Sequence, residues 1–452
     1  MEPFLRGCIT TLERGAPSLH VVLGNETCDL DSMVSAIAFA YFLSKTAVDQ
    51  KAAFVPVLNI PRSEFPLRGE CTFLLQQNSL SEDLLVFRDE IDLHGLHRDG
   101  RLVLTLVDHN VLPRGDSALE DLVMEVVDHR RLERPLTPGL AVTTEPVGSC
   151  ATLVTERIIL KAPDILDRQL ADVLRSTILL DCINMAPEAG KVTPKDTEYV
   201  TTLESRFTDL LPRAVVFDSL QRAKFDVSGL TIEQMLRKDL KVLSGGDILL
   251  AISAVYLRLE ELLARPGLKA GFEEFCRARG YSVLVVMTIT FEQKSEPFRQ
   301  LAVYSPHCNL RESVSRALEE SETPLLQLTP LDSPDSEIVA YHQGNGQASR
   351  KKVLPVIVDF LKAQEAGRSD PAVVCWGWGT VSRVPRGQGE EEGEDVEETA
   401  CDEEVYLPPT PMNSLVEGCP LDGGLPKLLQ EAILERFDKM AVEGPVVDPS
   451  NH

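Results

Sequence analysis

The chain has 452 residues, which is too long for a single ordinary hydrophobic core, so we expect two domains and a tail. Its net charge of −25 is uneven, because residues 388–452 carry 17 acidic and 3 basic side chains and leave −11 for the rest. The mildly acidic charge of residues 1–387 argues against broad nucleic-acid binding. The sequence has no run of eighteen apolar residues, so we expect no transmembrane helix.

Cysteine usage and the first residues predict where the protein resides. The ten cysteines are scattered and include no Cys-x-x-Cys pair, which is typical of reduced thiols. Residues 1–8 lack the basic-then-apolar layout of a secretory signal. We therefore expect the protein in the cytoplasm, with the nucleus as a further location.

Strand-like and helix-like segments alternate along the first half of the chain. This alternation predicts βαβ units and a parallel sheet. The helix after the first strand should begin at Asp31 or Ser32 as its N-cap. The residues just before Asp181 fit either a helix or a strand. The expected strands are 19–23, 53–58, 84–88, 102–107 and 124–127, and the expected helices are 31–43, 149–161 and 167–180.

The second half predicts a smaller α/β domain. A polar helical stretch from about 193 to 240 precedes strand-like runs at 248–256, 282–291 and 301–304, with a helix at 259–279 interrupted at Pro266-Gly267. The predicted fold class is therefore α/β, with a parallel-sheet domain, a smaller substrate-binding domain and a tail. The predicted ranges are 1–214, 215–380 and 381–452. Ten carboxylates between Glu390 and Glu404 predict a disordered tail.

Acidic side chains follow the apolar runs of the first domain. Asp29 and Asp31 follow the first strand, and Asp108 follows a later one. The run 124–127 ends in Asp128-His129-Arg130, and 178–180 ends in Asp181. Ligands bind at the carboxyl ends of parallel strands, where these carboxylates would repel one another without cations. We interpret the pattern as a metal cluster for phosphate chemistry; taken singly, each acid could equally cap a helix or a loop.

These motifs together resemble the DHH phosphoesterase superfamily. A Ser-Arg-Lys-Lys segment at 349–352 resembles the substrate-binding motif of its second, DHHA2-type domain. That branch is shared by family II inorganic pyrophosphatases and cytosolic exopolyphosphatases. The segment 407–415 and the overall layout resemble animal prune proteins. The motifs are Asp29-x-Asp31-Ser32, Asp108-His109-Asn110, Asp128-His129-Arg130, residues 145–152 and Leu180-Asp181.

The resemblance implies a two-metal hydrolase of short-chain polyphosphate with water as the nucleophile. The cofactors would be two divalent cations, Mg²⁺ or Mn²⁺, with Asp108 bridging them and acting with His129 and Arg130 in catalysis. Arg350 and Lys351, with Lys352 as a further candidate, would hold the phosphate chain. The implied metal ligands are Asp29, Asp31, Asp108, His129 and Asp181.

Two positions depart from the pyrophosphatase pattern, which has histidine at both. Asn25 offers a neutral amide, and Arg130 offers a permanent cation that cannot exchange protons. We therefore expect both side chains to contribute to substrate binding rather than to rapid pyrophosphate hydrolysis. Both residues are compatible with the exopolyphosphatase-like members of the superfamily, which act on short polyphosphate chains.

Two other functions are compatible with the same sequence. The parts for two-metal phosphoester hydrolysis also fit a cyclic-nucleotide phosphodiesterase. A low-turnover adaptor is the other alternative, because Pro408–Pro411 can form polyproline II and residues 425–440 an amphipathic docking helix. Resemblance to prune-type proteins implies nucleoside diphosphate kinase and regulators of the cytoskeleton and cell migration as partners.

Overall fold

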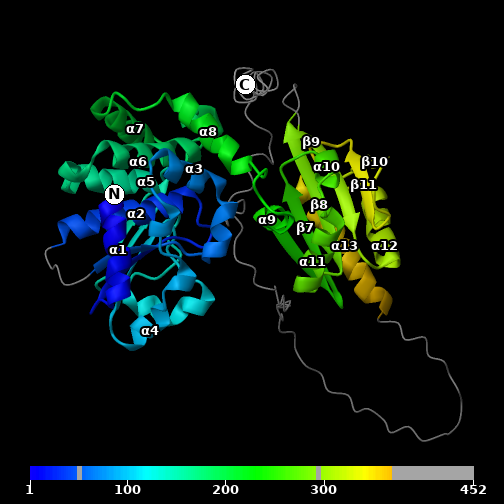
Figure 1. The fold of residues 1–452 in the computed structure, drawn as a ribbon, viewed down its shortest axis with the longest axis horizontal. Coiled ribbons are helices and arrows are strands. Elements are labelled where there is room, and N and C mark those ends of the chain that lie inside the picture. Colours follow the sequence, from blue (N-terminus) through cyan, green and yellow to red (C-terminus); the bar gives the residue numbers. More distant parts are fainter. Residues whose placement is uncertain (48–52, 292–296, 369–452) are drawn as a thin grey trace, which may run out of the picture.

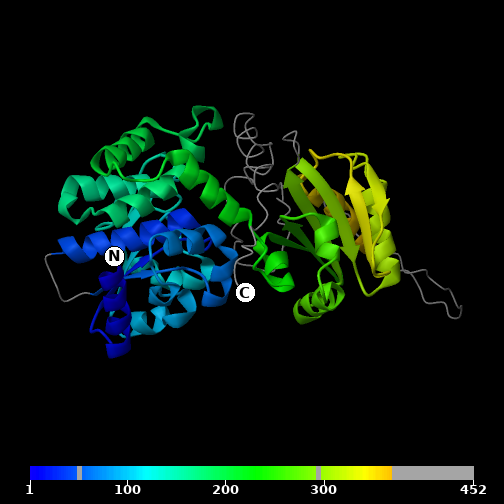
Figure 2. The same cartoon turned by 45° about the horizontal axis from the view of Figure 1, so that its top comes forward.

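The computed structural model describes residues 1–47, 53–291 and 297–368. Figure 1 and Figure 2 show two lobes joined through consecutive helices, one formed by the N-terminal half and the other by the C-terminal half of the described chain. The predicted acidic tail, the polyproline segment and the docking helix lie outside the described residues. None of the described helices is long and apolar enough to cross a membrane.

The first domain is built on a five-stranded sheet in the order β2-β1-β3-β4-β5. All its strand pairs are parallel, which confirms the predicted fold class. Buried aliphatic side chains fill the central strands, as expected for a sheet covered on both faces. The strands are β1 (Leu19–Leu23), β2 (Ala53–Val57), β3 (Leu102–Val107), β4 (Val123–Asp128) and β5 (Ala141–Thr144).

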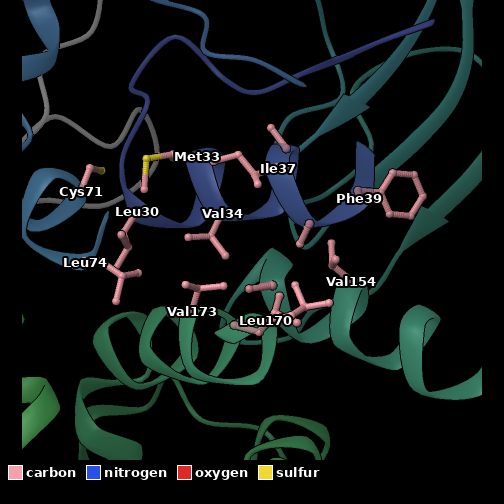
Figure 3. Close-up of a cluster of buried hydrophobic side chains, with 14 of the residues drawn as sticks. Leu30, Met33, Val34, Ile37, Phe39, Cys71, Leu74, Val154, Leu170 and Val173 are labelled. Atoms are coloured by element: carbon pink, nitrogen blue, oxygen red, sulfur yellow. The ribbon is translucent and has the colours of Figure 1, made fainter. Parts of the chain in front are cut away.

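Helices cover both faces of this sheet. On one face α1 (Glu2–Arg14) and α4 (Leu93–Arg98) pack against the strands, and a larger group covers the other. The central helix of that group, α2, is buried over most of its length, and Figure 3 shows Val34 on its side facing Val173. The group consists of α2 (Leu30–Thr46), α3 (Gly69–Gln77), α5 (Cys150–Lys161), α6 (Arg168–Asp181), α7 (Pro194–Arg206) and α8 (Arg213–Phe225).

Two local predictions were wrong, and one alternative that the sequence left open was decided. Residues 84–88 form no strand; 3₁₀ turns η2 (Glu82–Leu84) and η3 (Arg88–Glu90) flank a single bridge between Leu58 and Phe87. The helix after β1 is capped by Asp29, because its carboxylate reaches the backbone of Ser32. The residues before Asp181 are helical throughout, since they continue the buried face of α6. The remaining 3₁₀ segments are η1 (Arg62–Leu67), η4 (Arg114–Leu122), η5 (Pro163–Ile165), η6 (Ile183–Met185) and η7 (Pro187–Ala189).

The second domain has a six-stranded mixed sheet in the order β10-β11-β9-β8-β7-β6. Only β7 and β8 run parallel, joined by α10 (Leu259–Leu263) and α11 (Leu268–Arg279), which separate at the predicted Pro-Gly break. With α9 (Ile232–Lys238) these helices cover one face, and α12 (Cys308–Glu319) and α13 (Arg350–Arg368) cover the other. The strands are β6 (Leu240–Gly245), β7 (Ile248–Val255), β8 (Val283–Phe291), β9 (Pro297–Tyr304), β10 (Leu328–Leu331) and β11 (Ile338–Gln343).

Candidate active site

The turn between β1 and α2 places two aspartates at the start of a buried helix. Asp29 Oδ1 accepts a hydrogen bond from the Ser32 amide at 3.1 Å, so Asp29 is the N-cap. Gly24 is required here, because a Cβ would lie 2.3 Å from Ser32 Oγ. Asp31 follows in the first turn and is buried. The sequence thus fixes Asp31 on a rigid element at the carboxyl edge of the sheet.

The carboxylate of Asp31 also faces the N-terminus of a second helix. Its Oδ2 accepts from the Cys150 amide at 2.6 Å, and its Oδ1 accepts from the Ala151 amide at 2.8 Å. Ser35 Oγ donates to Oδ1 at 3.0 Å. Because the positive end of the helix dipole of α5 favours negative charge, these contacts hold Asp31 in one orientation.

Asp108 lies directly after β3 in a left-handed backbone conformation, with φ 61°. This conformation is uncommon for a residue with a Cβ and is found mostly where function requires it. Asn25 Nδ2 donates to Asp108 Oδ2 at 2.6 Å. No described residue forms a hydrogen bond with the other oxygen, Oδ1, although it is buried. Asp108 therefore presents one carboxylate oxygen without a hydrogen bond from the described chain.

A histidine and an arginine from the loop after β4 approach that oxygen. His129 Nε2 lies 3.4 Å and Arg130 Nη2 lies 3.9 Å from Asp108 Oδ1. The His129 Nδ1–H donates to the Val147 carbonyl at 2.9 Å, which leaves Nε2 as a ligand atom. Ligand atoms of Asp31, Asp108 and His129 all lie within 4.8 Å of one another. Three strand ends thus bring these three side chains together.

Asp181 reaches the same region from the last residue of α6. Its Oδ2 is buried, and within the described chain it has no hydrogen-bond partner. The negative end of a helix dipole disfavours a carboxylate, so a cation is needed to stabilise it there. Burial raises the pKa of Asp181 well above its ordinary value. The negative charges of Asp31 and Asp29 raise this pKa further.

The charges of this cluster are not balanced by its own cations. Burial, followed by the charge of Asp31, raises the pKa of Asp108 to about 7. Burial likewise raises the pKa of Asp31. For His129, burial by itself lowers the pKa, but the adjacent Asp108 carboxylate outweighs it and raises the pKa to about 10. The cluster therefore retains protons that a bound cation would replace.

The donor set fits a hard divalent cation. Carboxylate oxygens with one imidazole suit Mg²⁺ or Mn²⁺. Ligand distances of about 2.1 Å allow two ligands of one ion to lie up to roughly 4.2 Å apart, similar to the spacing of the Asp31, Asp108 and His129 ligand atoms. The oxygens of Asp108 and Asp181 that accept no hydrogen bond from the described residues supply the vacant acceptor positions that such an ion needs.

Cation binding should strengthen as the pH rises. The folded-state pKa of Asp108 is raised from 3.8 to about 7, so its contribution disfavours folding progressively between those values. The pKa of His129 is raised from 6.5 to about 10, so its stabilising contribution is complete below 6.5 and lost toward 10. Both effects weaken the metal-free protein as pH rises, and a cation reverses them.

We therefore expect the increase in melting temperature caused by a fixed Mn²⁺ concentration to be larger at about pH 8 than at about pH 6. Differential scanning fluorimetry measures this directly. The Asp108→Asn variant, which lacks one of the protons to be displaced, should show a smaller pH dependence. An equal increase at both pH values in the parent protein would contradict the assignment of this cluster as a cation site.

The remaining predicted residues lie in different settings. Asn25 Oδ1 accepts from the amides of Thr27 and Cys28 at 2.9 and 3.0 Å, so this oxygen shapes the turn and only Nδ2 faces Asp108. Arg350 begins α13 in the second domain and pairs with Asp239, with 2.6 Å between Nη2 and Oδ1. The neighbouring Lys351 and Lys352 are exposed. The predicted basic triplet thus lies at the start of α13 in the second domain, whereas the metal cluster lies in the first.

Several supporting residues escaped sequence reasoning. The Arg68 guanidinium is buried and donates twice to the Thr27 carbonyl, at 3.1 and 2.8 Å, and so holds the Asp29 turn. The i, i+4 spacing of Asp31 and Ser35 in a predicted helix was a usable signal for their contact. No comparable signal existed for Arg68 or Asp239, since their partners lie far along the chain.

Comparison with known proteins identifies the family. A model of the DHH family, N-terminal domain, matches residues 20–178, and a model of the DHHA2 domain matches residues 218–360. The chain belongs to the DHH family. The resemblance drawn from the motifs is thereby confirmed, and the first and second domains are referred to below as the DHH and DHHA2 domains.

Named relatives cover most of the chain. The exopolyphosphatase PRUNE1 of Homo sapiens is 50% identical over 448 residues, which cover 98% of this chain and 98% of that protein. A putative exopolyphosphatase of Schizosaccharomyces pombe is 30% identical, covering 77% of this chain and 92% of that protein. A probable manganese-dependent inorganic pyrophosphatase of Bacillus pumilus is 25% identical, covering 75% of this chain and 98% of that protein.

Proposed function

We propose that the protein hydrolyses phosphoanhydride bonds of short-chain inorganic polyphosphate with water as the nucleophile and divalent cations as cofactors. The names of the relatives support phosphoanhydride hydrolysis as the reaction class: exopolyphosphatase at 50% identity and manganese-dependent pyrophosphatase at 25%. The choice of short chains rests on the resemblance to exopolyphosphatase-like members, and the choice of Mg²⁺ or Mn²⁺ rests on the carboxylate and imidazole donors of the site.

The observation that carries the proposal is the pair of buried carboxylate oxygens in the DHH domain that accept no hydrogen bond from the described chain. Within the described residues, Asp108 Oδ1 and Asp181 Oδ2 have no hydrogen-bond partner. Leaving such groups buried without compensation costs about 1–3 kcal/mol each, and more for charged groups. A fold that keeps two of them beside Asp31 and His129 is arranged to bind cations.

Each residue then has a defined part. Bound divalent cations would lower the pKa of water and stabilise negative charge on phosphoryl oxygens. The α5 amides fix Asp31, and Asn25 fixes Asp108. Arg130 is 23% exposed beside Asp108, so its guanidinium can hold a phosphate oxygen at the edge of the cluster. Arg350, Lys351 and Lys352 would bind the rest of the phosphate chain.

The test is phosphate release from tripolyphosphate before and after removal of metal with EDTA. We expect EDTA to abolish phosphate release and Mn²⁺ or Mg²⁺ to restore it, while circular dichroism shows that the metal-free protein stays folded. A cyclic nucleotide and pyrophosphate serve as comparison substrates. Activity that persists in EDTA would refute metal-dependent hydrolysis, and faster hydrolysis of the cyclic nucleotide would favour a phosphodiesterase.

A further inference from the structure

Three consecutive residues at the end of α9 contact both domains. Figure 1 shows α9 on the side of the second lobe that faces the first. Arg237 forms an ion pair with Glu64, which lies in η1 of the DHH domain. Lys238 and Asp239 follow, both buried. Because this segment touches elements on each side of the domain connection, it can determine how the two domains' functional groups are placed.

Lys238 reaches into the DHH domain. Its ammonium group donates to the Leu67 carbonyl at 2.6 Å, and the residue is only 1% exposed. Burial lowers the pKa of Lys238, and the nearby Glu70 carboxylate opposes that effect. A buried ammonium is costly unless it is paired, and here the Leu67 carbonyl and the nearby Glu70 carboxylate supply its partners.

The carbonyl that receives Lys238 adjoins the support of the metal-binding turn. Leu67 immediately precedes Arg68, whose guanidinium holds the Thr27 carbonyl. Arg68 Nη1 also donates to the Glu64 carbonyl at 3.0 Å. The segment that contacts α9 is therefore the same segment that fixes the turn leading into Asp29.

On the other side, Asp239 holds the first arginine of α13. Arg350 Nη2 lies 2.6 Å from Asp239 Oδ1, and Arg350 Nη1 donates to the Asp239 carbonyl at 2.5 Å. Tyr256 Oη donates to Asp239 Oδ2 at 3.1 Å, which fixes the carboxylate. One hydrogen bond to the Asp239 carbonyl and one ion pair with its carboxylate thus set the plane of the Arg350 guanidinium.

We propose that Lys238 and Asp239 are positioning residues for binding of the phosphate chain. Asp239 orients the guanidinium of Arg350. Lys238 fixes the end of α9, and with it Asp239 and Arg350, to the DHH-domain segment that supports the metal-binding turn. The inference rests on the proposed function, because Arg350 is taken there as a substrate contact. It assigns to the end of α9 a role in joining the cation cluster of the DHH domain to the phosphate-binding arginine of the DHHA2 domain.

The test is a double-mutant cycle with steady-state kinetics on tripolyphosphate. Asp239→Asn keeps the side-chain shape but removes the charge that orients Arg350, so we expect KM to rise about tenfold with little change in kcat. Arg350→Ala should raise KM at least as much, and the double variant should not exceed Arg350→Ala alone. Asp239→Glu restores the charge and should recover part of the KM.

Controls separate positioning from general destabilisation. Asp335→Asn removes another carboxylate of the DHHA2 domain, one that pairs with Lys269, and should leave KM near the parent value. The increase in melting temperature with Mn²⁺ should be the same in Asp239→Asn as in the parent, because the cation cluster is intact. Lys238→Met retains the apolar stem but leaves the Leu67 carbonyl without its donor, so it should raise KM and modestly lower the melting temperature in EDTA, while the increase in melting temperature with Mn²⁺ stays at the parent value.

The outcomes distinguish the inference from the proposed function. If Arg350→Ala raises KM but Asp239→Asn leaves it unchanged, or if their effects are additive, the positioning role is overturned and the proposed function stands. An unchanged KM in Lys238→Met overturns the connection between the domains. If Arg350→Ala itself leaves KM unchanged, the proposed substrate contact fails, and the inference fails with it.

Discussion

Replacing Asp108 by Asn is expected to reduce phosphate release from tripolyphosphate about a thousandfold, because cation stabilisation of the transition state is worth several kcal/mol. The substitution leaves the volume of the side chain nearly unchanged but removes the charge that a cation needs. In the parent protein, Asp108 Oδ1 faces His129 and Arg130, and the substitution places a neutral amide at that position. The loss should appear in kcat, with Mn²⁺ producing a much smaller increase in melting temperature.

The metal-free Asp108→Asn protein should melt close to the parent at neutral pH, because relief of the buried charge is offset by loss of the ion pairs with His129 and Arg130. Burial raises the pKa of Asp108 to about 7, so the charged carboxylate is disfavoured in the folded state. Removing that charge relieves the repulsion from Asp31. Thermal melting in EDTA checks this expectation, and it separates loss of chemistry from loss of fold.

Asp128→Asn is the matched control for this variant. Asp128 is also buried at a strand end, and it also accepts a 2.6 Å hydrogen bond from an asparagine amide, that of Asn110. Its carboxylate is engaged by its own loop, so activity should stay within about tenfold of the parent. Equal losses in both variants would show that strand-end packing, not cation binding, limits activity.

Replacing Asp181 by Asn is expected to reduce phosphate release about a hundredfold and to weaken Mn²⁺ binding. Asp181 stands at the C-terminal end of α6, where the helix dipole gives a carboxylate no stabilisation. A neutral amide is more favourable there, so the metal-free variant should melt no lower than the parent. Phosphate release and Mn²⁺-induced shifts in melting temperature are the two measurements.

The same helix offers a control for Asp181. Asp172 is buried too, and burial raises its pKa. It precedes Asp181 by nine positions, about two and a half helical turns, so the two side chains lie on opposite faces of α6. Asp172→Asn should therefore retain activity and Mn²⁺ binding. If Asp181→Asn is as active as Asp172→Asn, Asp181 is not required for the reaction.

The apolar runs of the first domain were enough to predict its architecture. The strands that precede Asp108 and Asp128 formed where expected, because aliphatic runs bounded by polar residues are stable only when buried in a sheet. Parallel strands place their carboxyl ends at one edge, so the grouping of Asp31, Asp108 and His129 followed from chain order alone. The α/β class was predictable for the same reason, whereas the family was predicted from the resemblance of the motifs at these strand ends.

Short and ambiguous segments were decided by packing. Residues 84–88 have the composition of a strand, but they form only a single bridge, to Leu58 just after β2, between two 3₁₀ turns. The run before Asp181 fitted strand and helix equally, and burial against α2 selected the helix. Local sequence gives such segments similar free energies in either form, so their tertiary neighbours determine the outcome.

The sequence by itself determined the fold class, the family and the set of acidic strand ends. Only the tertiary structure decided which carboxylate oxygens of those residues accept hydrogen bonds and which remain available to a cation. Asp31 meets the α5 amides 119 and 120 positions away, and Lys238 meets the Leu67 carbonyl 171 positions away. Contacts of that separation leave no periodic signal in the chain, because they depend on how finished elements pack against one another.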